Sequence, residues 1–364
     1  MILKVKNKLR SIFRNNIFVK KTLLRLLDCY YKYTPLIVGQ LVRYPAYLKH
    51  TLNSTVIVGP GTFSFGAIFN PGALLMNDEI ILLANAQKVP WFKARGKYEK
   101  FYMQGNPLIM RLDRHSNKII EKNIVTEIID LPQDEDYGIE DFRLFQWQGM
   151  KMINHSLVTR KKINGLIGQS GSVSALSILD EKEKTFRFYS VPKLDFPLQT
   201  FEKNWIFKEK DQQLYLFYSL NPYRVLILEN EESYSFTTII NQKLPGRIID
   251  PGNLGTMVSF STNPIDFDEK HWLVVVHQIQ YRFTGRNYVH WAVLINSATK
   301  LPVKITSRPI FTGMGARGRA PGIRYISSIV KNGREVFFFA GAGDMYVTVT
   351  RKSIDELMSL FVPI

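Results

Sequence analysis

From about residue 55 onward, hydrophobic residues occur in short runs that are rich in β-branched and aromatic side chains. Turn-forming residues separate these runs, which is the pattern of strands joined by tight connections. The clearest runs are residues 79–84, 151–158, 214–220, 272–277, 291–295 and 335–340. Helical periodicity is almost absent until a last turn over residues 353–360. The pattern therefore predicts an all-β domain.

A repeat runs through this β-rich part of the chain. Each unit has a polar or Gly/Pro-containing segment, then a short turn, then a strand. The polar segments are marked by Asn70, Glu140, Lys203, Thr262 and Arg324, so the units follow one another at about 70, 63, 59 and 62 residues. Five units of this length predict a five-bladed β-propeller. Equivalent loops of such a fold converge on a central channel, so we expect the five polar segments to form one site.

The N-terminal segment has a different character. Residues 2–28 predict a helix with Val5, Leu9 and Phe13 on one face and basic side chains on the other. Residues 1–50 contain eleven Lys/Arg and one acid, Asp28, so they carry +10 of the total charge of +17. We therefore divide the chain into a basic amphipathic helical arm, 1–50, and a propeller catalytic domain, 51–364.

The arm has two interpretations. It either binds an anionic membrane surface through residues 1–30 or packs on the propeller. Because the basic charge is concentrated there, a nucleic-acid groove across the whole fold is not expected. No convincing signal peptide and no run of about 20 apolar residues is present. With the single cysteine, Cys29, this predicts a cytoplasmic protein or one peripheral at the inner face of the membrane.

The richest chemistry lies in one segment, Glu140-Asp141-Phe142-Arg143. Two carboxylates beside a guanidinium can keep one carboxylate ionised and aimed; the alternative is a solvated turn with a salt bridge. We take Asp141 and Glu140 as candidate catalytic residues. Other polar side chains in the repeats or at strand ends are candidates for substrate binding: Asn70, Asn85, Arg143, Arg160, Lys203, Asn204, Tyr218, His277, Tyr281 and Asp344. This set suits a polyhydroxylated, partly anionic ligand such as a sugar phosphate.

Other chemistries are less well supported. The six histidines do not pair at metal-ligand spacing, so we expect no metal site. No glycine-rich phosphate loop and no nucleophile elbow is present, and we expect no cofactor.

Several segments resemble the inverting β-mannoside phosphorylase family and the related propeller-fold β-mannosyltransferases. The resemblance is carried by residues 69–73, Glu140-Asp141-x-Arg143, Lys203-Asn204, His277 with Leu294 and Pro302, and residues 341–344. It implies a five-bladed propeller in which Asp141 is the catalytic acid and Asn70 and Asp344 hold the sugar. It further implies phosphate binding by basic residues such as Arg160 and Lys203.

Two departures from the family pattern influence the functional hypothesis. Phe142 stands where the family usually has Pro, and Tyr218-Ser219 replaces a His-Arg pair at the end of the third-unit strand. The lost pair argues against simple phosphorolysis, and free sugar metabolism would not need a basic arm.

These departures favour an inverting glycosyltransferase. It would move a sugar, most simply mannose, from a sugar-phosphate or nucleotide-sugar donor to an oligosaccharide or lipid-linked glycan acceptor at the cell surface. Asp141 would be the base, assisted by Glu140, while Arg143, Arg160 and Lys203 would neutralise the donor phosphate. The first alternative is a β-mannoside phosphorylase, and the second is a non-catalytic carbohydrate-binding propeller. Hydrolysis ranks lowest because it would need a second, separately placed carboxylate.

Overall fold

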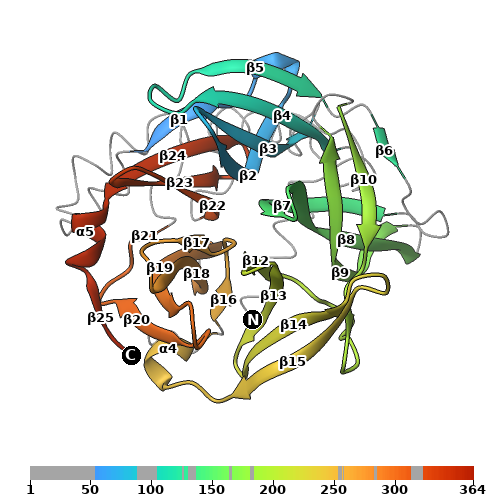
Figure 1. The fold of residues 1–364 in the computed structure, drawn as a ribbon. Helices are drawn as coiled ribbons and strands as arrows, with labels where there is room; N and C mark the ends of the chain where they lie inside the picture. The colour runs from blue at the N-terminus through green and yellow to red at the C-terminus, as the bar shows by residue number, and fades with distance from the viewer. Residues whose placement is uncertain are drawn as a thin grey trace, which may run out of the picture.

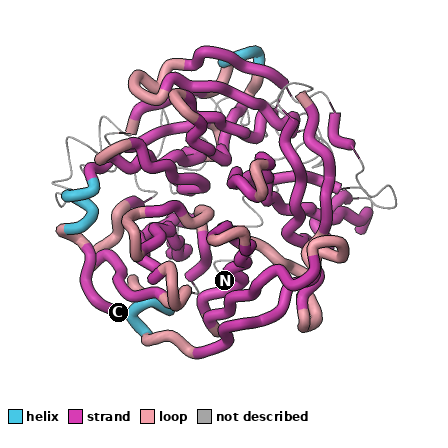
Figure 2. Tube along the Cα trace, in the orientation of Figure 1, coloured by secondary structure: helices cyan, strands magenta, loops and turns pink. Residues whose placement is uncertain are grey.

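The computed structural model describes residues 54–87, 105–124, 127–129, 137–163, 166–180, 184–252, 256, 258–282, 285–312 and 323–364. Strands dominate these residues (Figure 2). They form five separate sheets, arranged in chain order around a common centre (Figure 1). The prediction of an all-β domain is confirmed. The basic arm, 1–50, lies outside the described residues, so its helix and its membrane contact stay predictions.

The first three sheets each begin at the centre and continue outward. The first contains β2 (Ala67–Met76), β3 (Glu79–Gln87), β4 (Gly105–Asp113) and β5 (Ile119–Ile124). The second contains β7 (Tyr137–Trp147), β8 (Met150–Ile163), β9 (Leu166–Asp180), β10 (Thr185–Ser190) and β6 (Glu127–Ile129). The third contains β12 (Ile206–Lys210), β13 (Gln213–Leu220), β14 (Tyr223–Asn230), β15 (Ser235–Gln242) and β11 (Lys193–Leu194).

The last two sheets include the first and the last strand of the described chain. In the fourth, β16 (Val258–Phe260) and β17 (Ile265–Asp266) pair with β18 (His271–Arg282), followed by β19 (Gly285–Asn296), β20 (Pro302–Thr306), β25 (Phe361–Pro363) and the short β21 (Phe311–Thr312). The fifth contains β22 (Arg324–Asn332), β23 (Glu335–Ala342), β24 (Tyr346–Ser353) and β1 (Thr55–Val58). The helical segments are η1 (Thr62–Ser64), α4 (Gly246–Ile249) and α5 (Ile354–Met358).

All six predicted hydrophobic runs lie within strands, and the predicted last turn contains α5. The hairpins form where the sequence has residues that tolerate a left-handed backbone. Asn77, Asp211 and Gly333 have φ of 50°, 52° and 59° at the turns that follow β2, β12 and β22. Such turns match the right-handed twist of the strands that they join.

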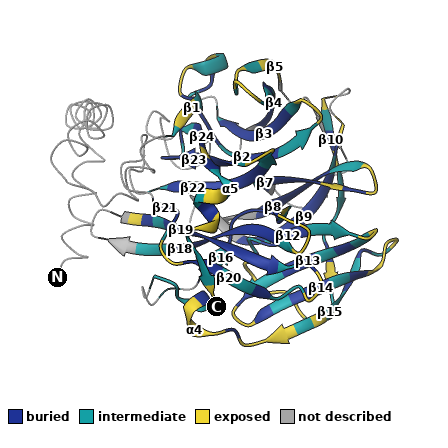
Figure 3. Cartoon of the chain, turned by 60° about the vertical axis from the view of Figure 1, so that its left-hand side comes forward, coloured by how far each residue is buried: buried dark blue, intermediate teal, exposed yellow. Residues whose placement is uncertain are grey.

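Hydrophobic clusters fill the space between neighbouring sheets, and buried residues concentrate there (Figure 3). Trp147 and Trp205 belong to the cluster between the second and third sheets. A larger cluster, with Trp272 and Trp291, joins the third sheet to the fourth. Three further clusters join the first sheet to the second, the fourth to the fifth, and the fifth back to the first. Each sheet therefore packs on two neighbours.

The innermost strands surround a pocket of about 510 Å³ on the axis. Its wall consists of short stretches from all five sheets: residues 73–75, 143–146, 207–211, 263–266 and 328–331. Corresponding stretches of the five units therefore meet at the centre, but none of the five polar markers, Asn70, Glu140, Lys203, Thr262 and Arg324, belongs to this wall. No helix among the described residues is long and apolar enough to cross a membrane.

Candidate active site

Asp141 occupies an irregularity in the innermost strand of the second sheet. The register between β7 and β8 shifts between Glu140 and Arg143, and Asp141 has a left-handed backbone with φ of 60°. Asn70 occupies the equivalent place in β2, where the register shifts between Phe69 and Gly72 and φ is 49°. Irregularities of this kind re-aim side chains out of the regular alternation, and Asn and Asp tolerate the left-handed region better than other non-glycine residues.

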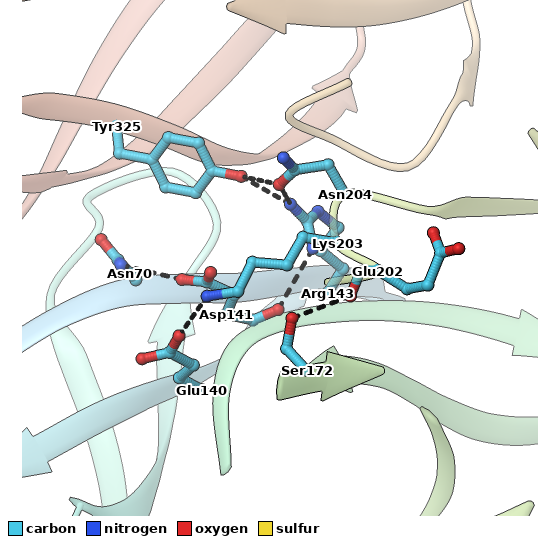
Figure 4. A network of polar contacts seen from close by, with 9 residues as sticks. All are labelled: Asn70, Glu140, Asp141, Arg143, Ser172, Glu202, Lys203, Asn204 and Tyr325. Carbon is cyan, nitrogen blue, oxygen red and sulfur yellow. Dashed lines mark hydrogen bonds and ion pairs between the residues drawn. The ribbon is translucent and has the colours of Figure 1, made fainter. Parts of the chain in front are cut away.

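The two bulges place Asn70 and Asp141 against each other. Asn70 Nδ2 donates to Asp141 Oδ1 at 3.1 Å (Figure 4). Gly341, in β23 of the fifth sheet, makes room for this contact. A Cβ at position 341 would lie 2.0 Å from Asn70 Oδ1 and 2.7 Å from its backbone nitrogen. The glycine therefore leaves the space that Asn70 occupies when it donates to the Asp141 carboxylate.

Glu140 has a different partner. Lys203 Nζ lies 2.6 Å from Glu140 Oε1, and both side chains are about one-third exposed (Figure 4). Partial burial acts to lower the pKa of Lys203, but the carboxylates of Glu140 and Asp141 outweigh it, and the net pKa is raised. Lys203 is therefore a cation at neutral pH. The predicted convergence of Glu140, Asp141, Asn70 and Lys203 is present in the structure.

Arg143 lies beneath the carboxylates and is 2% exposed. Its Nε donates to the Ser261 carbonyl at 2.6 Å, and Nη1 donates to the Asp141 carbonyl at 3.3 Å. Nη2 donates to Asn204 Oδ1 at 3.2 Å and to Tyr325 Oη at 2.5 Å. The guanidinium thus connects β7 to β22 and to the segments that precede β12 and β17. Its predicted contact with a phosphate stays a prediction, since these protein groups already engage Nε and both terminal nitrogens of the guanidinium.

Two tyrosines complete the site. Burial raises the pKa of Tyr288; Arg286 opposes that rise, and Asp141 and Asp344 add to it. The phenol near both carboxylates is thus a neutral donor. Burial likewise raises the pKa of Tyr325. Asp344, a predicted sugar ligand, lies on the turn between β23 and β24 with φ of 52°.

His277 supports this wall from behind. It is 5% exposed, its Nδ1 lies 2.8 Å from Ser261 Oγ, and its ring stacks on Tyr288 at 5.5 Å between centroids. Burial, together with the charge of Arg143, lowers the pKa of His277 to about 3. The imidazole is therefore neutral and positions Tyr288, and the structure does not support its prediction as a direct substrate ligand.

The other predicted ligands differ in their placement. Asn204, with φ of 66°, touches Arg143. Tyr218 and Asn204 line a second pocket beside the site, together with Lys203. Asn85 is 5% exposed on β3, opposite Phe69. Arg160 and Tyr281 lie on β8 and β18, but their side chains are outside the described residues.

Sequence reasoning missed Tyr288, Tyr325 and Ser261. Tyr325 directly follows the predicted Arg324, so the fifth polar segment contained a signal for it. Tyr288 has none, because it lies in a strand with no polar marker. Within the described residues, no group of three or more His, Cys, Asp or Glu side chains is placed to hold a metal ion.

Comparison with known families identifies the kind of enzyme. A family model for glycoside hydrolase family 130, described as beta-1,4-mannooligosaccharide phosphorylase, matches residues 49–362. With Glu140 and Asp141 adjacent on the innermost strand of the second sheet, this match defines an enzyme that acts on sugars. The chain belongs to glycoside hydrolase family 130. A comparison with curated proteins found no match.

Solved structures share the fold. A β-1,2-mannobiose phosphorylase from Listeria innocua, in complex with β-1,2-mannobiose, has a TM-score of 0.55 at 16% identity, over 84% of this chain and 96% of that chain. A structure described for glycoside hydrolases of this family that target β-1,2 mannosidic linkages in Candida mannan has a TM-score of 0.60 at 12% identity, over 83% and 92%. A GDP-Man-dependent mannosyltransferase from Leishmania mexicana has a TM-score of 0.55 at 12% identity, over 86% and 92%. At such identities the likeness concerns the fold alone.

The family assignment overturns the main functional hypothesis drawn from the sequence. A glycosyltransferase that uses an activated sugar donor is wrong, because the matching family model is that of a phosphorylase. The neighbouring structures also include phosphorylases and hydrolases of β-mannosides. The first alternative, a β-mannoside phosphorylase, agrees better with these findings.

Proposed function

We propose that this protein is an inverting β-mannoside phosphorylase and that its five sheets are the blades of a five-bladed β-propeller. Asp141 donates a proton to the glycosidic oxygen, and an oxygen of inorganic phosphate attacks the anomeric carbon from the opposite face. The bond to the leaving sugar breaks as the bond to phosphate forms. The products are α-mannose 1-phosphate and the shortened sugar, and the Asp141 carboxylate regains a proton from solvent.

The observation that carries this proposal is the different environment of the two adjacent carboxyl groups. Asp141 accepts from the uncharged amide of Asn70 at 3.1 Å, whereas Glu140 pairs with the Lys203 ammonium at 2.6 Å. A carboxyl group next to a neutral donor can carry a proton without leaving a cation unpaired. Glu140 is held in the ion pair with Lys203, so Asp141 is the carboxyl group that remains available to transfer a proton to the substrate.

The same contrast favours phosphorolysis over hydrolysis. An inverting hydrolase needs a second carboxylate that is free to activate water, about 6.5–9.5 Å from the acid. Glu140 is occupied by Lys203. Phosphate needs no such base, since it is already a nucleophile, but it needs nearby positive charge. Lys203 and Arg286 supply that charge, and both act electrostatically on Tyr288 or on the carboxylates of the site.

The test is product analysis with and without phosphate. Purified protein is incubated with β-1,4- and β-1,2-linked mannobiose and mannotriose in phosphate buffer and in a phosphate-free buffer, and products are followed by ³¹P and ¹H NMR. We expect α-mannose 1-phosphate in phosphate buffer and no turnover without it. Release of free mannose in both buffers would instead establish hydrolysis. Absence of any turnover of β-mannosides would overturn the proposal.

A further inference from the structure

A second pocket, of about 440 Å³, adjoins the proposed active site on the third sheet. Lys203 and Asn204 belong to its wall and connect it to Glu140 and to Arg143. The loop of residues 196–204 and the hairpin between β13 and β14 form most of the rest. The pocket therefore lies next to residues that contact Glu140 and Arg143, and it shares no lining residue with the axial pocket.

Arg224 contributes an unusual cation to this pocket. It lies on β14 directly opposite Ser219 at the end of β13. Its guanidinium carbon is 4.0 Å from the ring centroid of Phe196 and 5.7 Å from that of Tyr218. Its Nε is buried and has no hydrogen-bond partner. Aromatic rings thus hold the guanidinium in place, and no carboxylate among the described residues neutralises it.

The one carboxylate in the pocket wall is committed elsewhere. Glu202 is 5% exposed, and its Oε1 accepts from the Gln199 backbone nitrogen and from the Tyr218 hydroxyl, both at 2.8 Å. Burial, then Glu202, raises the pKa of Tyr218 against the opposing effect of Arg224. The phenol stays protonated and keeps donating to Glu202. The wall thereby separates the carboxylate from the guanidinium instead of pairing them.

An unpaired guanidinium held by aromatic rings at a pocket wall is suited to binding an oxyanion. Its planar set of N–H donors matches phosphate oxygens, and a charge-assisted hydrogen bond is about twice as strong as a neutral one. We propose that this pocket is a phosphate-binding subsite in which Arg224 is the principal ligand. The proposal rests on the proposed function for its place in the reaction, since the bound group lies beside Lys203 and the catalytic carboxylates.

Two sources of the phosphoryl group fit this chemistry. One is inorganic phosphate, the attacking reagent of phosphorolysis. The other is a phosphoryl group on the leaving sugar, for which the pocket has space and for which Phe201, 53% exposed at the wall, offers a stacking face.

Binding measured without turnover tests the subsite separately from the reaction. Isothermal titration of the full chain with inorganic phosphate, and in a second arm with mannose 6-phosphate, compares the wild type with Arg224→Met, which keeps an unbranched apolar side chain against the two rings. We expect affinity to fall about tenfold to a hundredfold for the ligand that occupies the subsite. Arg308→Met, on an exposed loop between β20 and β21, removes the same charge elsewhere and should leave affinity unchanged.

Each result has a defined meaning. Loss of inorganic phosphate binding in Arg224→Met assigns the attacking reagent to the pocket, and loss of mannose 6-phosphate binding alone assigns a phosphorylated leaving sugar. Equal affinities of Arg224→Met and Arg308→Met for both ligands would overturn the proposed subsite. So would the absence of binding of either ligand by the wild type. If Arg224→Met does not fold, Arg224→Lys decides, because it keeps the charge but not the planar fork and should bind several-fold more weakly. Phosphate binding through Arg224 without turnover of any β-mannoside would overturn the proposed function alone.

Discussion

Asn70 Nδ2 lies 3.1 Å from Asp141 Oδ1, although the two residues are 71 positions apart and belong to different sheets. Both have a left-handed backbone at a register shift of an innermost strand. The fold therefore uses the same local device in two repeats to bring an amide donor onto a carboxylate. A third residue, Gly341, leaves the space that Asn70 occupies.

Gly341→Ala should impair catalysis without unfolding the protein. The added Cβ would lie 2.0 Å from Asn70 Oδ1, so Asn70 must move and the Asp141 carboxylate loses its fixed direction. A displacement of about 1 Å in a catalytic group can cost on the order of 10²-fold in rate. We expect kcat/KM for phosphorolysis to fall by about that factor.

Gly246→Ala is the matched control for this substitution. A Cβ at position 246 meets no atom within 4 Å, so activity should stay at the wild-type level. Wild-type activity in Gly341→Ala, with the mutation verified by mass spectrometry, would show that the Asn70 contact does not position the acid.

Asp141→Asn should remove the proton donor while keeping the shape of the side chain. We expect kcat to fall by about 10²- to 10⁴-fold with β-linked mannobiose. A substrate with a leaving group of low pKa, such as dinitrophenyl β-mannoside, needs little protonation, so its loss should be much smaller. Equal losses with both substrates would contradict the role of Asp141 as general acid.

The strands and the convergence of the five repeats could be predicted because both depend on local patterns. Alternating apolar residues with Asn, Asp or Gly at the turns specify hairpins, and five similar units specify a ring. What could not be predicted was the direction of individual side chains. The sequence predicts that Arg143 contacts a phosphate, but in the structure its side chain, two residues after the bulge at Asp141, bonds to Tyr325 and Asn204.

The erroneous prediction of a glycosyltransferase has a similar origin. It depended on the loss of the family's His-Arg pair at Tyr218-Ser219, together with the basic arm. Across the hairpin, Arg224 lies opposite Ser219 and lines the same pocket. Comparing the sequence with the family pattern position by position does not reveal a side chain that the neighbouring strand supplies, because residues that face each other across two strands are known only once the register is known.

Arg143→Met should lower stability more than a typical substitution. Removing the guanidinium takes a donor away from the Ser261 carbonyl, the Asp141 carbonyl and Tyr325 Oη, whereas Asn204 Oδ1 still accepts from the Tyr325 hydroxyl at 3.3 Å. Each unsatisfied group costs about 1–3 kcal/mol. We expect the free energy of unfolding to fall by at least about 3 kcal/mol in urea titrations at neutral pH. Arg308→Met, at an exposed position, should change it by no more than about 0.5 kcal/mol. Similar values for the two variants would contradict the central role of Arg143 in joining the sheets.

The buried histidines should make the protein sensitive to mild acid. Burial lowers the pKa of His155 to about 4, and its Nε2 lies 2.9 Å from Ser177 Oγ, on β8 across the hairpin from the bulge at Asp141. In the unfolded chain this imidazole takes up a proton near pH 6.5, whereas in the folded protein it does so only near pH 4. The stability that this group contributes is therefore fully present above pH 6.5. It declines as the pH falls from 6.5 toward 4, by about 1.4 kcal/mol per pH unit for each such group.

His155→Gln should reduce the slope of unfolding free energy against pH between 6 and 4.5 by about that amount, whatever its effect at pH 7. The exposed His115→Gln should leave the slope unchanged, and an unaltered slope in His155→Gln would show that this residue does not couple folding to protonation.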